Sequence, residues 1–459
     1  MLVCGIDIGS TNLKVGLADG AGRLLQTATM PTPRTRDAIG IVTDPAQLLD
    51  EVERLVLDVW RKAGIGMPIS AFCTTGIGED GLLLGDDLTP LSAAIPWFDR
   101  RASADAAQVA ASDAATSRAG IVMDPTRTGA KWRWLARHHP ETMARARYWA
   151  ALTDFPLIAW GATPFISETL AARTGCYDPF VLGWLADLLR ACAAPPLPSV
   201  VAAGHVCGRL NNPRLIAAGA ATADTLLVSG GHDHAIAASA ILRSDPSACV
   251  DSLGTASVLY AEIPTIPPPP LDPLIALAAP VRGGAGLACI GVLEFSEALN
   301  AAGSPNEVRN FLAASPLPGQ PGQPHPIIAG HPDARSIRAV VEAAAMTTRA
   351  MLGKVPSAGP IYATGGWSRS SGLLQLRASV LGRTILTADE PELALVGAAL
   401  LAAEATGSPL AYQPDLRAIE PLPAWQRAYD AAYPVFLDRL HAAHDNAVAT
   451  IPRSPRGTA

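Results

Sequence analysis

The chain has 459 residues, of which 49% are hydrophobic and 17% are charged, and its net charge is −6. This composition excludes a disordered chain, and the length predicts two or three domains rather than one core. Nucleic-acid binding needs a basic surface that this acidic balance does not supply, so we expect no nucleic-acid partner. The seven cysteines form no CxxC pair, which favours reduced thiols over disulfides or a zinc site.

Neither a signal peptide nor a membrane span is predicted. Acidic Asp7 follows the first apolar residues at once, without a basic segment or a long apolar stretch. The apolar run 396–403 is much shorter than the roughly 20 residues that cross a membrane. We therefore expect a cytoplasmic protein with no membrane partner.

The first part of the chain alternates short strands with one helix. Strands are predicted at 2–8, 13–18 and 23–29, and the glycine-containing turns between them indicate hairpins. Apolar residues within 45–63 recur with the spacing of an amphipathic helix, and 69–75 returns to a strand. This order is typical of a mixed α/β layer.

A similar but weaker order follows in the second half. Two strands there flank a second glycine–hydroxyl turn, which suggests an internal duplication. The predicted strands are 224–229, 249–253 and 256–261, and the predicted helices are 235–242, 336–352 and 372–381.

Two proline-rich stretches, 263–273 and 315–326, cannot form central strands or helices and are expected to be surface loops. The domain boundary is placed just before the second hairpin. This gives an N-terminal domain of residues 1–243 and a C-terminal domain of residues 244–459.

The first turn, Asp7 to Asn12, carries a carboxylate, a glycine and two hydroxyls. A glycine turn lets backbone N–H groups approach phosphate oxygens, and hydroxyls add hydrogen bonds. Asp7 can hold Mg²⁺, which prefers oxygen ligands. An ordinary hairpin turn with a solvated aspartate is the alternative. Residues 251–257 repeat the pattern, and two such turns favour a nucleoside triphosphate clamped between two domains.

Asp233 follows two glycines and precedes a predicted helix. It is a candidate general base, and a helix N-cap is the alternative role. The flanking His232 and His234 lack an evident third ligand, so we do not expect a metal bound by histidine. Residues 364–370 contain a double glycine between a strand and a helix, which is a nucleotide-approach geometry.

In this order, the motifs resemble the FGGY family of carbohydrate kinases, members of the actin-like ATPase superfold. The resemblance covers nearly the whole chain and includes 5–16, 230–233, 252–257, 365–399, and a Trp-x-Asp-x-Arg segment within 95–101. It implies an α/β fold of two actin-like (ribonuclease H-like) domains. Each domain would be a mixed β-sheet flanked by helices, with an interdomain cleft between the two.

The resemblance also implies roles for individual residues. Asp233 would be the catalytic base, and it would bind Mg²⁺ together with Asp7. The cofactors would be ATP and Mg²⁺. The residues implied to bind ATP are Gly9, Ser10, Thr11, Asn12, Lys14, Gly254, Thr255, Gly365, Gly366 and Arg369.

Glu79 and Asp80 lie where xylulose kinases carry Gln-Met-His and glycerol kinases carry Asn-Gln-Arg-Glu. Their carboxylates would accept hydrogen bonds from hydroxyls of the substrate and would repel a sugar acid. A turn that merely exposes its acids is the alternative. Asp99 and Arg101 are further substrate candidates, although Arg101 paired only with Asp99 is the alternative there.

The sequence therefore predicts an ATP-dependent kinase for a small neutral sugar, with a ketopentose or ketohexose as its substrate. A glycerol or erythritol kinase is the alternative within this class, and a non-catalytic sugar-sensing protein is the alternative outside it. A DNA-binding regulator would need a helix-turn-helix, and the chain begins directly with the phosphate motif. Segment 325–333 is shorter than the corresponding family loop, so the oligomeric state, a homodimer included, stays open.

Overall fold

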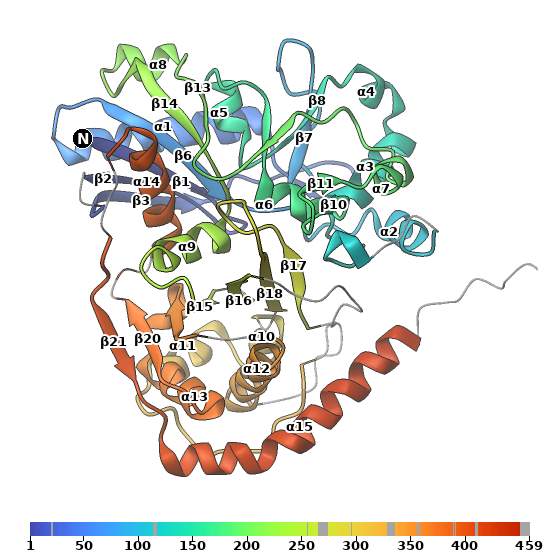
Figure 1. Cartoon of the computed structure of the whole chain (residues 1–459), viewed down its shortest axis with the longest axis vertical. Helices are drawn as coiled ribbons and strands as arrows, with labels where there is room; N and C mark the ends of the chain where they lie inside the picture. The colour runs from blue at the N-terminus through green and yellow to red at the C-terminus, as the bar shows by residue number, and fades with distance from the viewer. Residues whose placement is uncertain are drawn as a thin grey trace, which may run out of the picture.

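The structure is a computed structural model that describes residues 1–19, 22–112, 117–254, 256–264, 274–294, 296–327, 336–355, 359–388, 390, 392–408 and 412–449. It contains two large mixed β-sheets, each flanked by helices (Figure 1). This arrangement confirms the predicted α/β class.

The first sheet has the strand order β13-β14-β6-β1-β2-β3. β1 pairs antiparallel with β2 and parallel with β6, and β14 pairs parallel with β6. The three parallel strands therefore end at one edge of the sheet. The strands are β1 (Leu2–Ile8), β2 (Asn12–Asp19), β3 (Leu24–Pro31), β6 (Ile69–Gly76), β13 (Val206–Arg209) and β14 (Ala221–His232).

Helices cover both faces of this sheet, so every residue of β1 is buried. Side chains alternate between the two faces of a strand. Cys4 and Ile6 share a core cluster with apolar residues of helix α1 (Pro45–Ala63). Val3 shares a different cluster with helices α9 (Asp233–Leu242) and α14 (Leu393–Ala405) on the other face.

Helix α14 comes from the second half of the chain, yet it packs against β1, β6 and α9 (Figure 1). Glycines allow this close approach. A Cβ atom on Gly397 would lie 2.0 Å from the carbonyl oxygen of Ile236 in α9. A Cβ atom on Gly5 would lie 2.7 Å from the carbonyl oxygen of Leu395. The backbones therefore touch where the two halves join.

The second sheet has the order β17-β18-β16-β15-β19-β20-β21. Helices α12 and α13 contribute its core, and the long helix α15 packs on α13 and α12 at one end of the molecule (Figure 1). The elements are β15 (Cys249–Leu253), β16 (Ala256–Ile263), β17 (Ala276–Ala278), β18 (Leu287–Glu294), α10 (Ser296–Ala302), α11 (Pro305–Ala313), α12 (Ile337–Leu352), β19 (Ile361–Thr364), α13 (Ser371–Leu381), β20 (Ile385–Ala388), β21 (Leu416–Ile419) and α15 (Pro423–Ala449).

Smaller elements lie outside the two large sheets. They are β4 (Thr35–Arg36), β5 (Ile41–Val42), β7 (Gly81–Leu84), α2 (Ser103–Ala110), α3 (Thr128–His138), α4 (Pro140–Arg145), β8 (Tyr148–Ala151), α5 (Phe155–Ala159), β9 (Phe165–Ser167), α6 (Glu168–Ala171), β10 (Tyr177–Asp178), β11 (Gly183–Trp184), α7 (Ala186–Ala191), β12 (Ser199–Val201) and α8 (Pro213–Ala217). Among the described residues, no helix has the length and apolar character needed to span a bilayer.

One local prediction was wrong. The strand expected at 224–229 runs from Ala221 to His232, so Gly230 and Gly231 lie within the strand rather than after it. Continued pairing with β6, through a register shift between Val228 and Gly231, explains the extension. The division into 1–243 and 244–459 remains a proposal. Most of the proline-rich segment 263–273, and part of 325–333, lie outside the described residues.

Gly397→Ala should destabilise the protein by about 1–3 kcal/mol, because the new Cβ overpacks the contact with Ile236. Alanine at an exposed helix position would instead be favourable by about 1 kcal/mol over glycine, so the sign is diagnostic. Urea unfolding followed by circular dichroism measures the difference. Gly183→Ala is the control, because a Cβ at Gly183 would have its nearest neighbouring atom 3.9 Å away. Equal stability of wild type and Gly397→Ala would contradict the packing argument.

Candidate active site

The turn between β1 and β2 is held by its neighbours. The Gly9 N–H donates to the Asn12 carbonyl at 3.0 Å, and the Thr32 hydroxyl donates to the Gly9 carbonyl at 2.6 Å. Arg34 Nη2 donates to the Ser10 carbonyl at 3.2 Å. Thr11 is exposed at the tip of this turn. Hydrogen bonds to its backbone therefore hold the turn in place, and its tip remains accessible to a ligand.

Asp7 lies near the end of β1 and is 7% exposed. Its Oδ1 is buried and has no hydrogen-bond partner among the described residues. Burial and the neighbouring Asp233 carboxylate raise the pKa of Asp7 to about 8, although Lys14 acts in the opposite direction. Lys14 is the cross-strand partner of Asp7, and its Nζ lies 2.5 Å from Glu392 Oε2. Lys14 therefore lies beside Asp7 as one half of an ion pair with Glu392.

Asp233 is the first residue of α9, directly after β14, and its side chain is 38% exposed. Its Oδ1 accepts the His234 N–H at 2.6 Å and lies 2.8 Å from His232 Nδ1 and 3.3 Å from His234 Nδ1. Burial acts in the other direction, but these histidine contacts hold the pKa of Asp233 below its usual value. His232 occupies the N-cap position, so the N-cap alternative for Asp233 does not apply.

The two carboxylates thus share one sheet edge but differ in proton affinity. Burial and the charge of His232 lower the pKa of the His234 imidazole to about 4, so its ring is neutral at physiological pH. An ionised, half-exposed carboxylate beside a buried one with an unpartnered oxygen fits a hard divalent cation such as Mg²⁺. Asp7 and Asp233 are the residues that would hold it.

The histidines themselves form a cluster with Asp233 in which the possible ligand atoms lie within 4.8 Å of one another. Asp233 thus supplies the third possible ligand atom, which was not evident from the sequence. Both Nδ1 atoms face the same Asp233 oxygen, however, so the cluster is already joined by internal contacts. Its clearest effect is to orient Asp233.

The second glycine turn lies in the other sheet. β15 and β19 are parallel and pair Ser252 with Thr364, so Gly254 and Gly365 leave the sheet at the same edge. Gly365 has φ +88°, and a Cβ there would lie 2.7 Å from the Leu253 carbonyl oxygen. Gly366 and Arg369 are exposed beside this turn. Thr255 lies outside the described residues.

A buried arginine holds the strand that leads into this second turn. Arg377 of α13 is 1% exposed, and its Nη2 lies 2.5 Å from Oδ2 of Asp251 in β15. The same nitrogen contacts the hydroxyl oxygens of Ser257 and Thr348 at 3.1 and 2.9 Å. The strand that leads into Gly254 is therefore fixed by a charge pair.

Glu79 follows β6 and is 6% exposed. Its Oε1 accepts hydrogen bonds from Arg127 Nη1 at 2.8 Å and from Arg173 Nε and Nη2 at 2.9 and 2.6 Å. Burial acts in the other direction, but Arg173 and Arg127 lower the pKa of Glu79 to about 2. Two guanidinium groups thus neutralise Glu79, which removes the basis for the expected repulsion of a sugar acid at this point.

Asp80 has no exposed surface. Its Oδ1 accepts the Trp97 N–H at 2.6 Å, and its Oδ2 lies 3.4 Å from Arg34 Nη1. In this structure Asp80 therefore offers a substrate no accessible surface, and its contact with substrate remains a prediction.

Arg101 pairs with Asp99 through hydrogen bonds of 2.8 and 2.9 Å and with Asp37 at 2.7 Å. Its side chain is 3% exposed and its guanidinium lies 5.1 Å from the centre of the Trp134 ring. The alternative that Arg101 serves as the partner of Asp99 accounts for these contacts.

Arg127 and Arg173 were not predicted from the sequence. No local motif marks either residue, because their shared partner Glu79 is 48 and 94 positions away along the chain. Burial of Glu79 would imply a cationic partner, but the sequence shows neither the burial nor which cation provides it.

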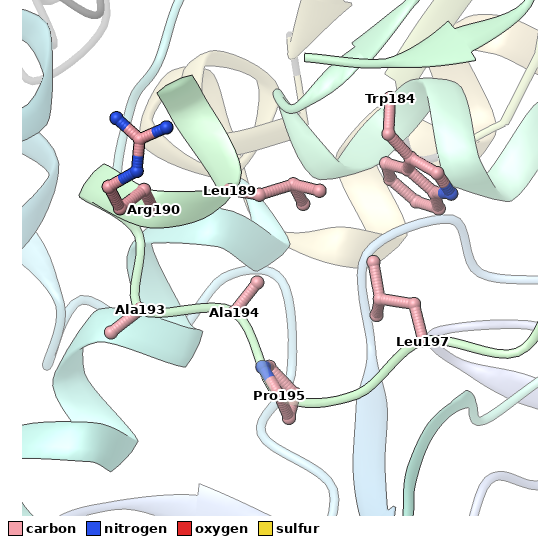
Figure 2. A pocket seen from close by; sticks show the side chains of 7 residues that line it. All are labelled: Trp184, Leu189, Arg190, Ala193, Ala194, Pro195 and Leu197. Carbon is pink, nitrogen blue, oxygen red and sulfur yellow. The ribbon is translucent and has the colours of Figure 1, made fainter. Parts of the chain in front are cut away.

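A separate open pocket with a volume of about 460 Å³ lies beside α7 (Figure 2). It is lined by Trp184 of β11, by Leu189 and Arg190 of α7, and by Ala193, Ala194, Pro195 and Leu197. None of the predicted site residues borders this pocket, so it carries no argument for the chemistry.

Sequence models of two domains of one protein family match this chain. That of the N-terminal domain of the FGGY family of carbohydrate kinases matches residues 2–240, and that of the C-terminal domain matches residues 301–406. The crystal structure of xylulose kinase from Rhodospirillum rubrum superposes with a TM-score of 0.82 at 23% identity, covering 97% of this chain and 99% of that one. This likeness shows the fold, which is the two-domain actin-like arrangement that the motifs implied.

Sequence relatives match over shorter regions. Glycerol kinase from Alkalilimnicola ehrlichii is 29% identical over 223 residues, which cover 45% of this chain and 44% of that enzyme. Xylulose kinase from Streptomyces rubiginosus is 27% identical over 271 residues, which cover 57% of this chain and 54% of that enzyme. The aligned part therefore spans about half the length of these relatives.

Glu79→Gln should lower the free energy of unfolding at pH 7 by about 3–5 kcal/mol, because two arginines lose their buried anion. The folded-state pKa of Glu79, about 2, lies below its ordinary 4.5. Glu79 therefore contributes stability above pH 4.5, and this contribution is lost as the pH falls toward 2. Urea unfolding at pH 7, 4 and 3 should show the two proteins converging in acid. Exposed Glu141→Gln is the control, and a constant difference across these pH values would contradict the assignment.

Proposed function

This chain belongs to the FGGY family of carbohydrate kinases, and we propose that it transfers the γ-phosphoryl group of ATP to a hydroxyl of a sugar or polyol. The observation that carries this proposal is Asp233. It is ionised, half-exposed and held through one oxygen at the sheet edge where Asp7 also lies. An ionised carboxylate can accept the proton of a hydroxyl that comes within hydrogen-bond reach.

In this mechanism Asp233 accepts the proton of the substrate hydroxyl as the hydroxyl oxygen attacks the γ-phosphorus. The new oxygen–phosphorus bond forms while the bond to the β–γ bridging oxygen breaks, and ADP leaves. Mg²⁺ bound by Asp7 and Asp233 would neutralise charge on the phosphates. Phosphoryl transfer asks mainly for positioning and charge neutralisation, which the two fixed glycine turns are suited to supply.

ATP contacts are proposed for the turn residues of both sheets. The first turn would contribute Gly9, Ser10, Thr11 and Asn12, with Lys14 beside it. The second sheet would contribute Gly254, Thr255, Gly365, Gly366 and Arg369. The parallel exit of Gly254 and Gly365 from one edge supports this grouping.

For the substrate, we propose a small sugar, with a ketopentose or ketohexose as the leading candidate. This choice is supported by relatives that are named xylulose kinase and glycerol kinase. A polyol kinase is the second candidate, because a glycerol kinase is among the sequence relatives. A non-catalytic sensor is not favoured, because Asp7 and Asp233 are both retained.

Asp233→Asn should lower kcat by about 10²–10⁴-fold, because the amide cannot take up the hydroxyl proton. Binding of ATP should change little, since the variant keeps the shape of the side chain. Coupled detection of ADP gives kcat, and calorimetry gives the nucleotide affinity. Asp86→Asn is the matched control, because the Asp86 side chain is 94% exposed. Turnover close to that of wild type would remove Asp233 from the role of base.

A panel of ketopentoses, ketohexoses and C3–C6 polyols should include at least one compound that stimulates ADP release from Mg·ATP well above the background hydrolysis rate. The physical reason is that substrate, not water, then occupies the position beside Asp233. Selective stimulation by one ketose or one polyol would identify the substrate class. Silence across the panel with ATP still bound would contradict the proposed kinase activity on these classes.

A further inference from the structure

The Nδ1 atoms of His232 and His234 both lie close to the same oxygen of Asp233. The distance to Asp233 Oδ1 is 2.8 Å from His232 and 3.3 Å from His234. The two imidazole rings lie side by side, with their centres 3.8 Å apart and their planes inclined by 45°. Three possible ligand atoms therefore converge, and in the part of the chain that the structure describes this is the one such group that could hold a metal ion.

The spacing of these atoms is close to that of a zinc site. Zn²⁺ binds imidazole nitrogen and carboxylate oxygen at about 2.0–2.2 Å, so ligands in a tetrahedral arrangement lie about 3.3–3.6 Å apart. The nitrogen–oxygen distances of 2.8 and 3.3 Å need only a small movement to reach this range. The Asp233 side chain is 38% exposed, so a cation can enter from solvent and a water molecule can complete its ligands.

His234 can offer its Nδ1 lone pair without losing a hydrogen bond elsewhere. A neutral imidazole carries its proton on one nitrogen, and metal binding at Nδ1 places that proton on Nε2. The Nε2 atom of His234 is buried and has no hydrogen-bond partner among the described residues. The proton therefore breaks no existing contact at Nε2, and the bond to the metal replaces the contact that Nδ1 gives up.

A second observation favours a cation at this edge. Asp7 Oδ1 is buried without a partner among the described residues, and the Asp7 carboxyl group interacts electrostatically with Asp233. This oxygen does not distinguish one cation from another, but the two histidines do. Mg²⁺ takes oxygen ligands and keeps several waters, whereas imidazole nitrogen suits Zn²⁺ and other transition-metal ions.

We propose that His232, Asp233 and His234 bind a divalent transition-metal cation of the Zn²⁺ class, and that this cation inhibits the protein by occupying Asp233. The bound cation holds the carboxylate that otherwise takes up the proton of the substrate hydroxyl, and it keeps Mg²⁺ from that carboxylate. The site itself goes beyond the proposed function, whereas the inhibition rests on it. The proposal reverses the expectation from the sequence that histidine binds no metal here.

Titration of the metal-free full chain with Zn²⁺, in competition with a chromophoric chelator, tests the site. Wild type should bind one equivalent in the presence of excess Mg²⁺, because Mg²⁺ prefers oxygen ligands. His234→Phe keeps a ring but has no nitrogen, and it should weaken Zn²⁺ binding by about 100-fold, since even a partner outside the ligand shell is worth about 10- to 100-fold. The seven cysteines are buried, so they do not compete for the ion in the folded protein.

His441→Phe is the matched control, because His441 is exposed on α15 and this variant should bind Zn²⁺ as wild type does. If circular dichroism shows that His234→Phe fails to fold, His232→Phe removes the other nitrogen and serves in its place. Absence of Zn²⁺ binding by folded wild type, or equal affinity in wild type and the folded variant, would overturn the proposal. An equal loss in His441→Phe would mean an adventitious ion only and would overturn it too.

ADP release tests the inhibition separately. With an active substrate from the panel and Mg·ATP in large excess over Zn²⁺, the rate should fall in proportion to the occupancy measured by titration, and a chelator should restore it. A fully occupied site with an undiminished rate would overturn the inhibition. Zn²⁺ binding needs no phosphoryl transfer, so silence across the panel bears on the proposed kinase activity and leaves the binding measurement unaffected.

Discussion

The parallel pairing of β1, β6 and β14 is the constraint on which the site depends. It sets Asp7 opposite Thr75 and Thr75 opposite Gly231, so residues from distant parts of the chain reach one sheet edge. Backbone hydrogen bonds fix this register without help from the acids themselves. Asp7 and Asp233 interact electrostatically, and each negative charge disfavours ionisation of the other carboxyl group unless it is compensated. The histidines beside Asp233 supply this compensation on one side, and burial raises the proton affinity of Asp7 on the other.

At the same edge, the contacts that orient Asp233, the proposed base, differ in kind from those that hold Glu79. Asp233 is held by its immediate neighbours in sequence, His232 and His234. Glu79, in contrast, is held by long-range charge pairs with Arg127 and Arg173. A change around Glu79 can therefore leave the contacts that orient Asp233 in place. This division suits a fold whose members act on different small substrates.

Much of the fold could be predicted because its signals are local. The spacing of apolar residues predicted α1 with its observed bounds, and glycine turns between short apolar runs predicted β1, β2 and β3. The extension of β14 through Gly230 and Gly231 was missed because it depends on pairing with β6 rather than on propensity. The family resemblance is confirmed, whereas the assigned site residues remain predictions. The burial of Asp80 and the two arginines on Glu79 were invisible in the sequence, since each depends on contacts between residues far apart along it.

The position of α14 has a consequence for how the protein is made. Strand β1 leaves the ribosome long before the helix Leu393–Ala405, which covers one of its faces. Contacts of such high sequence separation form late. During synthesis, part of one apolar face of the N-terminal sheet therefore remains exposed until this helix has emerged. An exposed apolar face of this kind is prone to aggregation and is bound by chaperones. The nascent polypeptide, rather than the folded protein, is the stage at which this fold is most vulnerable to aggregation.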